Sequence, residues 1–423
     1  MMSRYESMLK KLPVGALVPG MYIHELCASW LETPFFKKSF LLEDAVMLAK
    51  ISKSGIEEAW IDTDKGDDVP PPPACAVDED SLVVVVPSLV IDTRAAPMAY
   101  RHVTRVSMAE EVGRATSIVN KSREAVLSMF TEARMGKAID AKNAMPLVEE
   151  IAASIMRNPG ALIGLARLKT ADDYTYMHSV AVCALMIALA SQLKLDDATT
   201  RELGLAGLLH DIGKMAVPST ILNKPGKLTD DEFVSVKQHP AAGHAMLLEA
   251  TGIGPIALEV CLHHHEKMNG SGYPHRLKGE QISLYARMGA VCDVYDAITS
   301  NRPYKQGWCP SESLSKMAEW SDGHFDPVVF QAFVRSIGIY PVGTLVRMAS
   351  GQLGVVVEQQ EGKLLLPKVR VFYSVKSMSH ITPVLLDLAA ANSSDKIVAR
   401  EEASKWGLTD INRYWLGDDA SST

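Results

Sequence analysis

The sequence predicts a mainly α-helical protein, in which a helical bundle core is preceded by a small N-terminal α+β module and followed by a small C-terminal β unit. Apolar residues recur at helical spacing from Ser107 to Met156, and apolar helical runs continue to about residue 336. Short runs separated by turn residues, typical of β-strands, lie on either side, at residues 12–63 and after Gly338.

The length indicates more than one domain. A chain of 423 residues exceeds one ordinary core, so two or three domains are expected. We expect an N-terminal module at residues 1–64, a Pro-rich and acidic linker with a short extended segment at 65–104, a helical domain at 105–337, and a β-rich unit with a polar tail at 338–423.

In the N-terminal module, Gly20–His24 and Gly55–Asp62 are predicted strands, and Leu42–Lys53 between them is a predicted helix. The four consecutive prolines Pro70–Pro73 favour an extended spacer after this module.

The helical stretch Ser107–Met156 has two interpretations that the sequence leaves open. It is either a signalling helix or dimer interface, or the first helices of the core.

The C-terminal unit has several β-like runs with glycine turns between them, and its polar end, Gly417–Thr423, is expected to be disordered. The predicted strands are Thr344–Met348, Leu353–Gln359, Lys363–Pro367 and Val369–Tyr373.

Composition excludes several classes of protein. A net charge of −7 argues against binding of a nucleic acid polymer but allows a local basic pocket for a small anion. The six cysteines have no CxxC spacing, which favours reduced thiols in the cytosol. The N-terminus lacks the apolar run of a signal peptide. The longest apolar helical stretch, Val180–Ala190, is shorter than the ~20 residues of a membrane span. We therefore expect a cytoplasmic protein without a membrane span.

The main functional signal is His210-Asp211, which ends the apolar helical run Leu203–Leu209. Imidazole nitrogen and carboxylate oxygen are both ligands of divalent transition metals, and a carboxylate can bridge two ions. A buried His-Asp pair is costly unless a cation satisfies it.

Further histidines and aspartates occur in the other apolar helical runs. Each one alone is more typical of a satisfied core residue. Together, five imidazoles and two carboxylates brought to one helical core favour a pair of cations. The candidate metal ligands are His178, His210, Asp211, His239, His264, His265 and Asp293.

The region from Asp172 to Pro327 resembles the HD-GYP family, a branch of the HD-domain metal phosphohydrolases whose characterised members hydrolyse cyclic di-GMP. The motifs that carry the resemblance are DDYTYMHS, LLHDIGKMAVP, ILNKPGKLT, KQHP, HHHEKMNGSGYP and CDVYDAITSNRPYK. The N-terminal segment also resembles a small module that recurs ahead of HD-GYP domains and has no settled biochemical role. The resemblance implies an HD-type helical bundle for the core.

The resemblance also implies how the ligands divide. One cation would take His178, His210 and Asp293, the other would take His239, His264 and His265, and Asp211 would bridge. Fe or Mn suit this mixed ligation best, and Zn, Ni or Co can also occupy it. His263 would point away, about 100° round the helix axis from His264. Tyr174 stands where some members carry a glutamate for a third metal, so two divalent ions are expected.

The implied reaction is attack by a hydroxide that bridges two metals about 3.5–4 Å apart. His210, Asp211 and Lys214 would be the catalytic residues. Lys214, Arg302 and Lys305 would contact phosphate oxygens. Gly272, Tyr273 and Pro274 belong to a loop that would shape the lip of the site and contact signalling partner proteins.

The sequence thus predicts a phosphodiesterase that hydrolyses cyclic di-GMP to pGpG. A second cleavage, of pGpG to GMP, is compatible with this prediction. Two alternatives stay open. One is a catalytically weak cyclic di-GMP receptor or adaptor, and the other is a phosphodiesterase for another cyclic dinucleotide. A homodimer is compatible with either.

Overall fold

The computed structural model divides the chain into two units, Met1–Ala96 and Pro97–Thr423, which are described separately. The structure describes residues 9–26, 39–44, 47–49, 51, 58–63, 65–67, 103–168, 174–224, 226–300, 307–391 and 393–417. The linker prolines Pro70–Pro73 and residues 418–423 of the predicted disordered tail lie outside these ranges.

The N-terminal unit contains an antiparallel sheet with the strand order β1-β4-β2-β3. Its strands are Leu9–Pro13 (β1), Tyr22–Leu26 (β2), Phe40–Leu41 (β3) and Glu58–Asp62 (β4). Buried apolar side chains, among them Met21, Ile23 and Ile61, form its core. Two predicted strands therefore overlap β2 and β4. The predicted helix at Leu42–Lys53 is wrong at its start, because the Leu42 amide donates to the carbonyl of Met21 and residues 42–44 are not helical.

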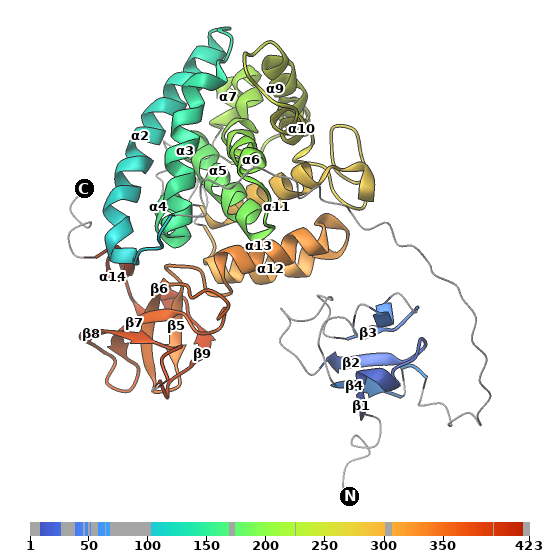
Figure 1. The fold of residues 1–423 in the computed structure, drawn as a ribbon, viewed down its shortest axis with the longest axis vertical. Helices are drawn as coiled ribbons and strands as arrows, with labels where there is room; N and C mark the ends of the chain where they lie inside the picture. The colour runs from blue at the N-terminus through green and yellow to red at the C-terminus, as the bar shows by residue number, and fades with distance from the viewer. Residues whose placement is uncertain are drawn as a thin grey trace, which may run out of the picture. The chain divides into compact units, whose positions relative to one another are not determined.

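The second unit begins with five helices, α2 to α6, which confirm the mainly α class (Figure 1). They are Met108–Arg134 (α2), Ala141–Arg157 (α3), Pro159–Arg167 (α4), Tyr174–Gln192 (α5) and Asp197–Leu209 (α6). A capping box between Ser107 and Glu110 starts α2. The buried faces of α2 and α3 join the main core, so the stretch Ser107–Met156 supplies the first helices of that core.

Helix α5 is the centre of the bundle. It packs against α2, α3, α4, α6, α11 and α13, and every residue from Val180 to Ala190 is buried. A helix that is surrounded on all sides must be apolar all round, which explains its composition. The window Thr175–Gln192 is long and apolar enough to cross a membrane, but 78% of it is buried inside the bundle.

Short helices and turns follow α6 and complete the helical part. They are Ile212–Ala216 (η3), Ser219–Leu222 (α7), Asp230–Val236 (α8), His239–Leu248 (α9), Pro255–His263 (α10), Gly279–Gln281 (η4), Leu284–Thr299 (α11), Pro310–His324 (α12) and Pro327–Ile337 (α13). Asp326 caps α13 at its start, and Gly338 ends it with φ +84°.

The C-terminal unit is an antiparallel five-stranded sheet with the order β8-β7-β6-β5-β9. Its strands are Leu345–Met348 (β5), Gln352–Glu358 (β6), Lys368–Ser374 (β7), Ser379–Asp387 (β8) and Ile397–Arg400 (β9), followed by Ala403–Trp406 (η5) and Arg413–Leu416 (α14). The predicted strand at Lys363–Pro367 is wrong. This segment is the turn between β6 and β7, in which the Leu366 amide donates to the carbonyl of Lys363.

The sheet shares its core with the bundle. Val342, Leu345 and Phe372 belong to the same buried cluster as the apolar residues of α2 to α6. The indole of Trp415 on α14 lies against Gly164 on α4, where an added Cβ would be 2.9 Å from the ring. Glycine at this position therefore lets the two elements touch.

Candidate metal centre

The seven predicted ligands come from five helical elements and lie close together. His178 comes from α5, His210 and Asp211 follow α6, His239 starts α9, His264 and His265 follow α10, and Asp293 comes from α11. Six of the ligands form two groups, and within each group all donor atoms lie within 4.8 Å of one another. One is His178, His210 and Asp211, and the other is Asp211, His239, His264 and His265.

Two glycines allow this convergence. At Gly207 on α6 an added Cβ would lie 2.8 Å from the Cα of Cys183 on α5, so the two helices can approach until the rings of His178 and His210 are 5.1 Å apart. At Gly213 on η3 an added Cβ would lie 1.9 Å from the carbonyl oxygen of His239. These close backbone approaches place both Asp211 and His239 at the centre.

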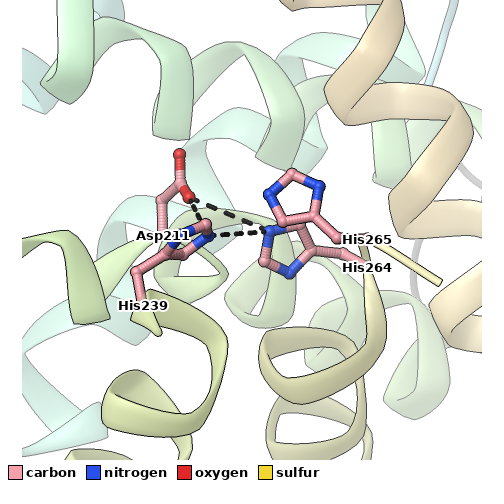
Figure 2. A group of neighbouring side chains, drawn as sticks. All are labelled: Asp211, His239, His264 and His265. Carbon is pink, nitrogen blue, oxygen red and sulfur yellow. Dashed lines mark hydrogen bonds and ion pairs between the residues drawn. The ribbon is translucent and has the colours of Figure 1, made fainter. Parts of the chain in front are cut away.

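Asp211 lies between the two groups. Its Oδ2 is 3.4 Å from Nε2 of both His178 and His210, and its Oδ1 is 3.2 Å from Nε2 of His239. Figure 2 shows Asp211, His239, His264 and His265 pointing toward one another. Asp293 lies beside the first group, with Oδ1 3.0 Å from Nε2 of His178, and its Oδ2 is 3.7 Å from Nδ1 of His265.

Backbone carbonyls fix the tautomers of three rings. Nδ1 of His210 lies 2.8 Å from the carbonyl of Gly207, Nδ1 of His239 2.7 Å from that of Val236, and Nδ1 of His264 3.0 Å from that of Cys261. A carbonyl only accepts, so each Nδ1 donates, and the neutral tautomer that this selects has its lone pair on Nε2.

These lone pairs face one another. Nε2 of His239 and Nε2 of His264 are 3.4 Å apart, and neither can donate to the other. Among the described residues, Nε2 of His210 and Oδ1 of Asp211 are buried without a hydrogen-bond partner. Unpaired buried acceptors are costly, and a cation satisfies all of them together. The donor set therefore fits divalent metal ions.

The pKa shifts of the site residues agree with a donor set for divalent metal ions. Burial, reinforced by the neighbouring His265 and His210, holds the pKa of His264 well below its ordinary value. Burial also lowers the pKa of His265 to about 3. Burial would raise the pKa of Asp211, but Lys214 and His210 hold it well below its usual range. These shifts favour neutral rings at His264 and His265 and an ionised carboxylate at Asp211, the states in which these groups bind metals.

His178 is held from behind by Asp296. Its Nδ1 donates to Oδ2 of Asp296 at 2.6 Å, which turns Nε2 toward Asp293 and Asp211. Burial alone would lower the pKa of His178, but the hydrogen bonds with Asp293 and Asp296 raise it. The carboxylates that attract a proton to this ring equally attract a cation.

Other predicted residues lie around the centre. Lys214 forms an ion pair with Asp211, so its ammonium group reaches the shared carboxylate. His263 points elsewhere, with Nδ1 2.8 Å from Glu259 and Nε2 2.9 Å from His275. Arg302, Lys305 and the side chain of Tyr174 lie outside the described part of the structure.

An open cavity of about 250 Å³ adjoins the centre and is lined by His264, His265, Tyr273, Asp293 and His324, among others. The Tyr273 ring lies 4.7 Å from the His265 ring, and Pro274 is half-buried beside it. Gly272 is buried, and an added Cβ would be 2.5 Å from the Cα of Glu266. Of the predicted loop Gly272–Pro274, Tyr273 thus lines the cavity beside the centre.

Sequence reasoning missed Glu266 and His324. Glu266 is buried and accepts from the amides of His275 and Leu277 at 2.7 and 3.1 Å, which anchors the segment after the loop. It follows the three histidines directly, but its charge made burial unexpected. His324 ends α12 far from the other motifs in the sequence, and no local signal places it beside the cavity.

Comparison with known proteins agrees with the geometry. The HD domain family matches residues 147–329, and a domain of unknown function (DUF3391) matches residues 9–144. A cyclic di-GMP phosphodiesterase of Pseudomonas aeruginosa is 52% identical over 411 residues, which are 97% of this chain and 96% of that protein.

Matches to other curated proteins are shorter. A cyclic di-GMP phosphodiesterase response regulator of Xanthomonas campestris is 41% identical over 35% of this chain and 39% of its own length. A 3'3'-cGAMP-specific phosphodiesterase of Vibrio cholerae is 38% identical over 39% of this chain and 38% of its own length. Among solved structures, an HDG"Y"P protein from Bdellovibrio bacteriovorus aligns at 17% identity with a TM-score of 0.45, over 77% of this chain and 98% of that one.

Proposed function

The chain belongs to the HD-GYP branch of the HD-domain phosphodiesterases, and from this membership we propose that it hydrolyses cyclic di-GMP to pGpG and can cut onward to GMP. The observation that carries the proposal is Asp211, a buried carboxylate shared by two groups of inward-facing imidazoles at the end of an open cavity. A relative that matches nearly the whole chain is a cyclic di-GMP phosphodiesterase, which supports the substrate.

We assign His178, His210 and Asp293 to one divalent ion and His239, His264 and His265 to a second, with Asp211 bridging them. Fe or Mn suit this mixture of imidazole and carboxylate best, while Zn, Ni and Co are also compatible. When bound, two such ions supply Lewis-acid stabilisation of a phosphodiester and lower the pKa of water.

The other residues bind and orient the substrate in this proposal. Lys214 is 22% exposed beside Asp211, so its ammonium group can turn from the carboxylate to a phosphate oxygen. Arg302 and Lys305 would bind the phosphates of the dinucleotide. Tyr273 presents an aromatic face in the cavity wall, on which a guanine base can stack.

The remaining parts have regulatory roles in this proposal. Residues 1–64 form a separate module joined by a linker at 65–104 to the catalytic helices at 105–337 and the β-rich unit at 338–423. The loop Gly272–Pro274 can also contact signalling partner proteins, and the chain can act in the cytoplasm as a homodimer.

The direct test is hydrolysis by protein purified without oxygen and loaded with Fe(II) or Mn(II). We expect cyclic di-GMP to give pGpG, and the double variant His210→Ala, Asp211→Ala to lose turnover and metal together. His263→Ala is the matched control, because this ring points away from the centre. Metal-loaded protein that binds cyclic di-GMP without cleaving it would contradict the proposal and identify a receptor.

A second substrate is worth testing because 3'3'-cGAMP-specific relatives match the catalytic region at 36 to 38% identity. A panel of cyclic dinucleotides compared by kcat/KM distinguishes the two. A higher kcat/KM for 3'3'-cGAMP would replace cyclic di-GMP as the substrate but leave the reaction class unchanged.

A further inference from the structure

A second cavity, of about 180 Å³, lies where the helical bundle meets the C-terminal β unit. Its walls come from α4, α5, the ends of α11 and α13, and the segment before β5. Asp296, which accepts the hydrogen bond from His178, also lines this cavity. The cavity therefore borders the metal centre without sharing any of the seven predicted ligands.

Arg167 at the end of α4 brings a cation into this cavity. The guanidinium has one described hydrogen bond, a long one of 3.5 Å from Nη2 to the carbonyl of Val342. Burial lowers the pKa of Arg167. Within the described residues, no carboxylate lies within 4.0 Å of this guanidinium.

The acidic residues that line the cavity already have cationic partners. Asp296 pairs with His178 at 2.6 Å, Glu358 with Lys368 at 2.9 Å, and Glu361 with Arg105 at 3.5 Å. The charge on Arg167 is thus uncompensated by protein groups in the described part of the chain. Arg167 is half-buried, and a charge that is partly withdrawn from water without a partner is unfavourable, so a ligand that supplies the missing negative charge would be stabilised there.

The neighbouring cation Arg157 is in a different situation. Its Nε and Nη2 both donate to the buried Glu111 at 2.7 Å. This bidentate pair shows how the bundle satisfies an arginine when the partner belongs to the protein. At Arg167 the equivalent partner is missing among the described residues, and a cavity occupies its place.

Part of the wall beside Arg167 is apolar. Ile163 on α4 and Ala181 and Leu185 on α5 face the cavity, together with Val342. We propose that this cavity binds a small organic anion, with its carboxylate or phosphate on Arg167 and its apolar body against α4 and α5. This site is additional to the proposed phosphodiesterase site, and it gives an anionic ligand contact with the residue that positions His178.

The test is titration calorimetry of the metal-loaded full chain with benzoate and, separately, with phenyl phosphate. Two probes distinguish a carboxylate from a phosphate ligand. The wild type should bind at least one probe, with a second class of site where the proposed phosphodiesterase site also binds it. Arg167→Gln should weaken one class about tenfold or more, since hydrogen bonds to charged groups are lost, and leave the other unchanged.

Two further variants make the test decisive. Ser336→Phe, which fills the cavity from the end of α13 and keeps Arg167, should remove the same class of site. Arg134→Gln, a matched loss of charge at an exposed position on α2, should bind like the wild type. If Arg167→Gln fails to fold, Ser336→Phe alone decides. A wild type that binds neither probe, or full binding in either cavity variant, overturns the proposal.

Discussion

At the scale of single residues, the centre depends on which nitrogen each histidine turns inward. Backbone carbonyls near the helix ends accept hydrogen bonds from Nδ1 of His210, His239 and His264. The Nε2 atoms of these three rings therefore face the centre. His178 differs, because its Nδ1 donates a hydrogen bond to a carboxylate, that of Asp296. A carboxylate behind a metal-binding imidazole raises the basicity of the ring, so His178 is the strongest imidazole donor expected here.

Adjacent histidines give the sharpest residue-level prediction. His264→Ala removes an inward lone pair and should lower the bound metal by at least one ion per chain, measured by elemental analysis after gel filtration. His263→Ala removes a ring that contacts Glu259 and His275 instead, so its metal content should equal that of the wild type. Equal metal loss in the two variants would contradict the assignment of the ligands.

Asp296→Asn tests the support behind His178. The amide keeps the shape but loses the charge, so metal affinity should fall about 10- to 100-fold, as for other partners of metal-binding histidines. The measurement is a metal dissociation constant from competition with a chelator. Asp140→Asn is the control, because this residue caps α3 and asparagine caps a helix equally well. Unchanged affinity in Asp296→Asn would show that Asp296 does not support the centre.

At the scale of elements, the contact between α5 and α6 sets the spacing of the first donor group. Gly204 and Gly207 on α6 face α5, and at both positions an added Cβ would come within 3.0 Å of α5 atoms. His178 and His210 are carried on these two helices, so a change in helix spacing is passed to the donors. The sequence contains this information only as two glycines inside an apolar helix.

Gly207→Ala should therefore separate α5 from α6. The new methyl group would meet backbone atoms at 2.8 Å, so we expect a loss of about 1–3 kcal/mol in the free energy of unfolding, as for other overpacked cores. Metal affinity should fall with it. Gly113→Ala on α2 has open space around it and should stabilise the protein by about 0.4–1 kcal/mol through its unfolded state. Urea denaturation of both variants checks the contrast.

The sequence identified the residues that lie at the centre, because their polar side chains are unusual within apolar helices. Sequence reasoning failed where the local pattern was misleading. The leucines of Lys363–Pro367 suggest a strand, but Leu365 is 48% exposed in a turn. Strand β8 was missed because most of its side chains are exposed on both faces, so it lacks the alternation that marks a half-buried strand.

At the scale of the whole molecule, the C-terminal β unit is part of the bundle's core and not an appendage. Trp415 is 2% exposed and packs on Gly164 of α4, and Phe372 of β7 stacks on Tyr414 at 3.8 Å. The contacts of Trp415 with Gly164 cannot be predicted from periodicity, because they join elements more than 200 residues apart in the sequence. They imply that the bundle and the β unit unfold together.

Trp415→Ala should destabilise both parts by about 3–5 kcal/mol, the usual cost of removing a large buried aromatic side chain. Helix content by circular dichroism and the fluorescence of the remaining tryptophans should be lost in one transition at a lower temperature. Trp60→Ala, at a half-exposed position in the N-terminal unit, should leave this transition unchanged. Separate transitions for helices and sheet in Trp415→Ala would contradict a shared core.

Removal of metal should lower the melting temperature of the same transition. An ion that binds only the folded state stabilises it by about 2.7 kcal/mol at a hundredfold excess over its dissociation constant. This binding free energy includes the contacts of the ion with the buried acceptors on His210 and Asp211, which have no hydrogen-bond partner within the described residues. Calorimetric scans before and after dialysis against a chelator measure the shift, and readdition of Mn(II) should restore it. An unchanged melting temperature would argue against a buried centre.

Because the two donor groups have Asp211 in common, occupation of one half of the centre orders a carboxylate that the other half also needs. The first ion to bind would order the Asp211 side chain and neutralise part of the negative charge around it. The second ion would then bind a carboxylate that is already ordered, at a site with less negative charge. Filling should therefore follow a defined sequence, with a half-loaded form that is populated at limiting metal. Catalysis should then rise with a lag as metal is added, and cellular metal supply would set the fraction of competent molecules.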